Sequence, residues 1–272
     1  MLRKSLAAAI AALSACSAHA MPVDLSGWQS EQHTRTSSAT NSGANWTVQG
    51  ANNDSVFQSV NGRPTVFFDP LADAQGTALS GEITVETNSD DDFVGFVLGY
   101  ETGEINSTAS DFILIDWKQG TQPNGGDGTA DEGLAISHVT SASGEGLWGR
   151  ETSNTPVGVR EIARATNLGD TGWVDNQTYS FDLVFTSSLI QVLVDDILEL
   201  SITAAEAGLT GFADGSFGFY NYSQSSVRYA GISESIVIDP DPDPDPNPVP
   251  GPAPLGLLLL GAAALQARRR MS

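Results

Sequence analysis

Cysteine is almost absent from this sequence, which has one, Cys16, among 272 residues. Cys16 lies in a segment with the features of an export signal, and the rest of the chain contains no cysteine. The chain therefore cannot form an intramolecular disulfide. An exported domain of this kind must be stabilised by its apolar core or by a bound metal. With only 3 histidines in addition, the sequence argues against a zinc site.

Basic residues are also few. The chain has 12 lysines and arginines against 33 acidic residues, and residues 21–238 carry 7 basic and 29 acidic residues, a net charge of −22. A surface this acidic repels nucleic acid and anionic lipid, so we expect no nucleic-acid partner. It suits metal cations, cationic partners or solubility in salt, and composition does not choose among the three.

Signatures of catalysis are missing as well. The sequence contains no Gly-x-Ser-x-Gly motif and no phosphate-binding glycine loop. His138 falls in a predicted strand, where a packed or surface residue is expected rather than a general base. A catalytic pair of carboxylates is not indicated either. The nearest such run holds Asp196 and Glu199, which are three residues apart, so on a strand they would face opposite sides. We therefore predict that the protein is not an enzyme.

The first 20 residues have the order of a secretory signal peptide. Two basic residues precede an apolar run from Leu6 to Leu13, and Ala18-His19-Ala20 offers small residues for cleavage. The apolar run is too short to span a membrane. The alternative to cleavage after Ala20 is lipidation of Cys16, because the residues that precede it resemble a lipobox.

The C-terminal part resembles a sorting signal. Residues 239–254, DPDPDPDPNPVPGPAP, predict a polyproline-II linker, because alternate prolines fix φ. Residues 255–272 form an apolar segment that ends in three arginines and two further residues. This order resembles the PEP-CTERM signal of Gram-negative bacteria, which implies an exosortase-type sorting enzyme and transient membrane association through the tail. A plain membrane anchor is the alternative.

Residues 21–238 show the period-two pattern of β-strands. The run "ALSGEITVET" alternates around Leu79, Ile83 and Val85, and "LIQVLVDDILELSI" predicts a hairpin that turns at Asp195-Asp196. Some ten or more short strands in about 215 residues predict an all-β antiparallel sandwich or barrel. Glycines 95 and 99 lie inside a predicted strand, which indicates a bulge or the close approach of another layer.

Five runs in this region resemble, in order and spacing, the thrombospondin C-terminal domain. They are DDDFVGFVLGY, FILIDWKQ, GLAISHVTSASGEGLW, GDTGWVDNQTYSFDL and GSFGFYNYSQSSVRYAGI, and the resemblance covers residues 24–236. It implies a two-sheet jelly roll of the concanavalin or L-type lectin kind. It also implies an extracellular, calcium-binding role in adhesion, without enzymatic activity.

An acidic block directly before the strand at 93–100 is the candidate calcium site. Calcium takes six to eight oxygen ligands, and no EF-hand pattern is present, so separate segments must supply them. The candidate ligands are Asp90, Asp91 and Asp92, with Asp127, Asp131 and Glu132 as weaker candidates. If the block continued the strand, neighbouring residues would face opposite ways and two of the three would converge. The alternative is a solvated sheet edge whose charges discourage aggregation.

These observations predict an exported surface or matrix protein of a Gram-negative bacterium. Its expected function is that of a calcium-binding adhesion module whose partner is a surface polysaccharide or a matrix protein. The alternative is a lectin that binds exopolysaccharide. Trp148, Tyr220 and Tyr222 are the candidate aromatic contacts to sugar, provided that they are exposed.

Overall fold

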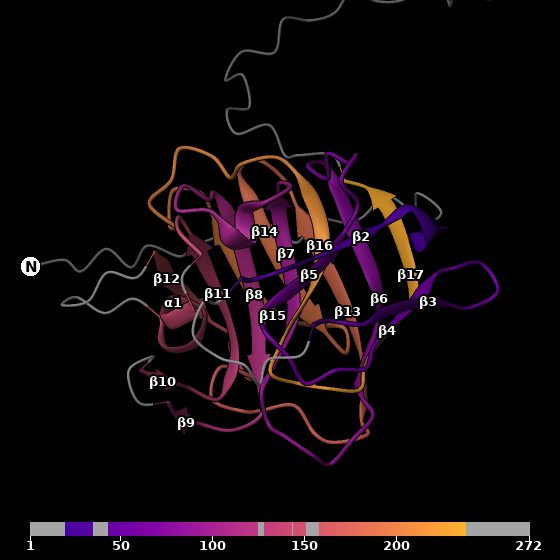
Figure 1. The fold of residues 1–272 in the computed structure, drawn as a ribbon. Coiled ribbons are helices and arrows are strands. Elements are labelled where there is room, and N and C mark those ends of the chain that lie inside the picture. Colours follow the sequence, from indigo (N-terminus) through magenta and orange to yellow (C-terminus); the bar gives the residue numbers. More distant parts are fainter. Residues whose placement is uncertain (1–19, 35–42, 125–127, 143, 151–157, 238–272) are drawn as a thin grey trace, which may run out of the picture. The chain divides into compact units, whose positions relative to one another are not determined.

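A computed structural model describes residues 20–34, 43–124, 128–142, 144–150 and 158–237 (Figure 1). Apart from Ala20, the predicted signal peptide lies outside these residues, as do the linker 239–254, the tail 255–272 and Asp127. Within the described ranges, no helix is both long enough and apolar enough to cross a membrane.

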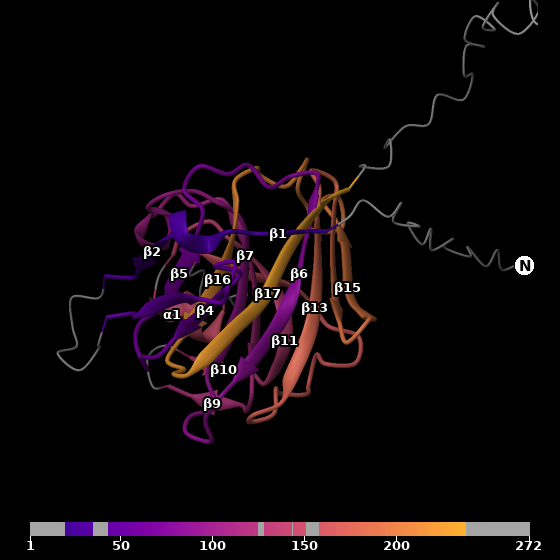
Figure 2. The ribbon, with the colours of Figure 1, turned by 90° about the vertical axis from the view of Figure 1, so that its right-hand side faces the viewer.

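Two antiparallel sheets build the domain (Figures 1 and 2). The eight-stranded sheet contains β1 (Met21–Pro22), β3 (Trp46–Gln49), β4 (Ser55–Gln58), β6 (Thr77–Val85), β13 (Thr178–Phe185), β14 (Leu189–Val194), β15 (Ile197–Thr203) and β17 (Val227–Ile236). Its order is β15-β14-β13-β6-β17-β4-β3, and β1 pairs with β17.

The second sheet has seven strands. These are β2 (Gln29–Gln32), β5 (Thr65–Phe68), β7 (Phe93–Tyr100), β8 (Phe112–Lys118), β11 (Gly133–Val139), β12 (Val159–Arg164) and β16 (Ser216–Tyr222). Their order is β12-β11-β8-β7-β16-β5-β2. The remaining elements are the pair β9 (Gln122–Pro123) and β10 (Thr129–Ala130), the helix α1 (Gly144–Gly149), and the 3-10 turns η1 (Leu25–Gly27) and η2 (Glu104–Asn106). The predicted antiparallel two-sheet sandwich is confirmed.

The main apolar core lies between the two sheets. On β6, Leu79, Ile83 and Val85 are buried while their neighbours are partly or fully exposed, as the alternating sequence predicts. On β13, Phe181 and Leu183 alternate in the same way and belong to the same cluster. The eight-stranded sheet therefore has one buried face and one face toward solvent.

The seven-stranded sheet is different, because its central strands are buried on both faces. Every residue of β7, β8 and β11 is buried. Alternate residues such as Val97 and Leu114 belong to a second apolar cluster, which also contains Leu147 and Trp148 of α1. Figure 1 shows α1, β9 and β10 gathered on one side of the sandwich. The segment that carries them covers the sheet face turned away from the main core.

Two local predictions are also confirmed. Asp195 and Asp196 form the turn between β14 and β15, with φ of 49° and 63°, the left-handed values that a tight hairpin turn requires. In β7, Gly95 lies against β8: a Cβ on Gly95 would lie 2.1 Å from the carbonyl oxygen of Ile115. The glycine in this strand is therefore required by the close approach of a neighbouring backbone.

Substituting Gly95 tests this packing. Gly95→Ala should lower the free energy of unfolding by about 3 kcal/mol or more, because backbone atoms cannot yield as the end of a side chain can. The matched control is Gly27→Ala, since a Cβ there meets nothing within 4 Å. Urea unfolding followed by tryptophan fluorescence measures both variants, and equal midpoints would contradict the proposed role of Gly95.

Candidate functional site

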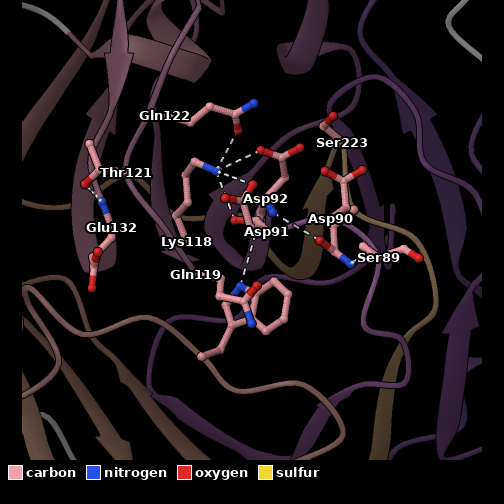
Figure 3. Close-up of polar contacts among 12 residues, drawn as sticks. Ser89, Asp90, Asp91, Asp92, Lys118, Gln119, Thr121, Gln122, Glu132 and Ser223 are labelled. Carbon is pink, nitrogen blue, oxygen red and sulfur yellow. Dashed lines mark hydrogen bonds and ion pairs between the residues drawn. The ribbon is translucent and has the colours of Figure 1, made fainter.

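The three aspartates of the acidic block converge at the entrance of β7. They precede the strand rather than belong to it, and Asp90 has a left-handed φ of 80°. The limit of two converging carboxylates, which assumed strand geometry, therefore does not hold. One carboxylate oxygen from each of Asp90, Asp91 and Asp92 lies within 4.8 Å of the others. Figure 3 shows the cluster beside Lys118 and Ser223.

Backbone hydrogen bonds hold the block in place from three directions. The carbonyl oxygen of Asp91 accepts a bond from the backbone N–H of Gln119, at 3.1 Å. The N–H of Asp92 donates to Oε1 of Gln224, and its carbonyl oxygen accepts from the indole of Trp173, each at 3.1 Å. Segments far apart in the sequence thus fix the positions of these carboxylates.

A buried lysine provides the counter-charge. Lys118 is the last residue of β8, and its side chain is 0% exposed. Its Nζ lies 2.8 Å from Oδ1 of Asp92 and 3.3 Å from Oδ1 of Asp91. It also donates to the Asp91 carbonyl oxygen at 2.9 Å and to Oε1 of Gln122 at 3.2 Å (Figure 3). The ammonium group is therefore surrounded by oxygen acceptors, as a buried charge requires.

Sequence reasoning missed this role of Lys118, although a signal was present. The chain has two lysines, Lys4 and Lys118, so the domain contains one. It stands at the end of an apolar strand in a strongly acidic domain. Its Nζ also lies 5.5 Å from the ring centre of Phe93 and 5.3 Å from that of Trp148, so the aromatic cover adds cation–π attraction.

The block is divided between a buried part and a solvent-facing part. Asp92 is 2% exposed, and burial raises the pKa of its carboxyl to about 6, although the Lys118 ammonium opposes the rise. The Asp91 side chain is 43% exposed, and Asp90 is exposed. Nδ2 of Asn61 donates a hydrogen bond to the Asp90 carboxylate. Asp90 and one side of Asp91 are therefore the parts of the block that a solvent cation reaches.

Two of the weaker candidate ligands, Asp131 and Glu132, do not join this cluster. Among the residues that the structure describes, the block at 90–92 is the one group of three convergent metal-ligating side chains. Asp131 is exposed and lines a separate cavity next to α1. Glu132 is half-buried, and its backbone N–H is bonded to Oγ1 of Thr121. Asp127 lies outside the described residues.

The aromatic residues considered as sugar contacts are buried. Trp148 is 4% exposed, Tyr220 0% and Tyr222 7%, and all three belong to the second apolar cluster. The condition that they be exposed is therefore not met, because the segment with α1 covers this face of the sheet. His138 is buried and lies 2.8 Å from the Asp111 carboxylate, so it is packed, as expected.

The family described as "Thrombospondin C-terminal region" matches residues 41–236. Thrombospondin-2 of Gallus gallus is 30% identical over 200 residues, which cover 68% of this chain and 16% of that protein. Cartilage oligomeric matrix protein of Homo sapiens is 26% identical over 200 residues, 69% of this chain and 25% of that protein. The chain thus corresponds to a quarter or less of the length of these relatives.

Solved structures with a similar fold are more distant. The carbohydrate-binding module CBM66 from Bacillus subtilis is 10% identical, with a TM-score of 0.49 over 76% of this chain and 94% of that chain. The carbohydrate recognition domain of Emp46p is 9% identical, with a TM-score of 0.42 over 79% of this chain and 90% of that chain. No functional conclusion follows from likenesses this remote.

Removing the buried ammonium should be costly. Lys118→Met leaves the Asp92 carboxylate buried without its counter-charge, so the free energy of unfolding should fall by about 3–5 kcal/mol near neutral pH. The double variant Lys118→Met/Asp92→Asn is the control. It should recover a large part of the loss, because no unpaired charge remains in the interior. Additive losses in urea unfolding would contradict the pairing.

The raised pKa of Asp92 predicts a pH dependence. Its folded-state pKa of about 6 lies above the unfolded value of about 4, so the folded state binds the proton more tightly between these values. The associated stability is fully present below about pH 4 and is lost as the pH rises through about 6.

Unfolding free energies of the wild type and Asp92→Asn, measured in chelator across this pH range, give the contribution of this group. The difference should move by on the order of 2 kcal/mol in favour of the variant as the pH rises. A difference independent of pH would show that Asp92 keeps its ordinary pKa.

Proposed function

Because the chain belongs to the thrombospondin C-terminal region family, whose match spans residues 41–236, we propose that it is a non-enzymatic, calcium-binding adhesion module. The observation that carries the calcium assignment is the convergence of Asp90, Asp91 and Asp92 at the entrance of β7. The proposed architecture is the jelly roll of L-type lectins, and the two antiparallel sheets support it.

The charges of the block fit a divalent cation. Three carboxylates and the Lys118 ammonium leave two negative charges when all are ionised. Lys118 neutralises Asp92 from inside, so the uncompensated charge belongs to Asp90 and Asp91, which face solvent. Calcium prefers oxygen ligands of this kind, and these two aspartates would hold it. The bound ion would supply the missing positive charge on the outer side of the block.

The remaining parts of the proposal rest on the sequence at the two ends. Residues 1–20 support export, and residues 239–272 support sorting by an exosortase-type enzyme in a Gram-negative bacterium. The protein would be secreted or held at the cell surface, with a surface polysaccharide or matrix protein as partner. A polysaccharide-binding lectin is the second candidate function, and a cavity described below favours it.

Calcium should stabilise the protein if the block binds it. A ligand at about 100 times its dissociation constant adds about 2.7 kcal/mol to the free energy of unfolding. We therefore expect a higher melting temperature in calcium than in chelator. The double variant Asp90→Asn/Asp91→Asn should lose most of this difference, because its amide oxygens carry no net charge.

The matched control is Asp195→Asn/Asp196→Asn. It removes two neighbouring carboxylates at an exposed turn, where asparagine also accepts a left-handed φ. This variant should keep the full calcium response. Equal melting temperatures of the wild type in calcium and in chelator would refute the calcium proposal, and an equal loss in both double variants would refute its location.

A further inference from the structure

A polar cavity lies beside α1 on the covered side of the seven-stranded sheet. Its volume is about 200 Å³, and it reaches solvent at the exposed residues Thr129 and Asp131. Its charged and aromatic lining includes Asp116 of β8, Trp148 of α1, Glu161 and Arg164 of β12, and Asp131 and Arg150 next to these elements. A single buried water requires only about 10–15 Å³ by this measure, so the space exceeds what one water fills.

The two arginines of the cavity are already neutralised. Arg150 forms an ion pair with Asp116, which is 2% exposed, and donates to the carbonyl oxygens of Gly146 and Leu147 at 3.2 and 3.0 Å. Because the two charges of this ion pair neutralise each other, Arg150 is not available to bind an anionic ligand.

The second arginine is held in the same manner. Arg164 lies 3.0 Å from the Glu161 carboxylate and donates to the carbonyl oxygens of Glu132 and Gly169, each at 2.7 Å. The cavity is therefore lined by paired charges, and the remaining carboxylate is that of Asp131. That carboxylate has no hydrogen bond or ion pair among the described residues.

Trp148 supplies a buried group that needs a partner. It is 4% exposed and lines the cavity, yet its indole N–H has no hydrogen-bond partner in the described part of the chain. A buried donor without an acceptor costs about 1–3 kcal/mol, so such groups usually meet water or a ligand. Trp148 with its unpaired indole N–H, Phe93 and the solvent-exposed Asp131 thus all line this cavity.

We propose that this cavity binds a single neutral sugar residue or cyclic polyol, such as the end of a polysaccharide chain. Hydroxyl groups both donate and accept, so one ring can donate to Asp131 and accept from Trp148. Anions are disfavoured because both arginines are paired. Divalent cations are disfavoured because, among the described residues, no cluster of three ligating side chains forms here. The inference does not depend on calcium at Asp90 and Asp91.

The binding test uses the full mature protein, in calcium and separately in chelator. Ligand-observed NMR is recorded with mannose, galactose, fructose, N-acetylglucosamine and myo-inositol, and with the charged counterparts glucuronate and glucosamine. At least one neutral compound should bind, and it should bind more tightly than both glucuronate and glucosamine. Binding of none, or preference for a charged compound, would overturn the proposal.

Variants then locate the binding. Trp148→Phe and Asp131→Asn should each weaken affinity about three- to tenfold, the effect of one hydrogen bond. Ala135→Leu, which fills the cavity from β11, should abolish binding. Asp196→Asn removes a carboxylate that does not line the cavity, at the exposed turn between β14 and β15, and should bind as the wild type does.

Melting curves show whether each variant is folded. If Ala135→Leu does not fold, Asp131→Asn decides, because Asp131 is exposed and makes no contact that holds the fold. Unchanged affinity in both Asp131→Asn and Trp148→Phe would place the ligand elsewhere and overturn the proposal.

Discussion

The buried ion pair between Lys118 and Asp92 is the interaction on which the acidic block at residues 90–92 depends. It lies where β8 ends and β7 begins, and Asp91, Gln122 and the rings of Phe93 and Trp148 complete its surroundings. Without the ammonium, the Asp92 carboxylate would be desolvated with two further carboxylates nearby, an arrangement that electrostatics strongly disfavours. With it, the block is anchored and its outer edge is free to meet a cation.

A second constraint is that the seven-stranded sheet is buried on both faces. The continuous apolar sequence of β7 makes this necessary, because one sheet partner covers only alternate residues. The segment with α1 covers the other face, and its Trp148 packs against Phe93 and Lys118. The polar cavity lies beside this segment, and Trp148 lines it. The surroundings of the Lys118–Asp92 ion pair and the cavity thus both depend on how this segment packs on the sheet.

Local patterns predicted much of the fold. The alternation on β6, the turn at Asp195-Asp196 and the tight packing at Gly95 could each be predicted, because each leaves a pattern within a few residues of sequence. The pairing of Lys118 with Asp92 was not predicted, because it joins residues that 25 others separate and depends on the register of β7 against β8. The burial of Tyr220 was not predicted either. The sequence around an aromatic residue on a strand does not show whether a distant segment of the chain covers it.

The acidic block has an inner half neutralised by Lys118 and, as proposed, an outer half that binds calcium. A crystal structure of the protein grown in calcium, with anomalous scattering to identify the ion, tests both halves together. We expect a calcium ion bound by Asp90 and Asp91, with the Lys118 ammonium still paired to Asp92. A block without metal at saturating calcium, or an ion in the position of the Lys118 ammonium, would contradict it.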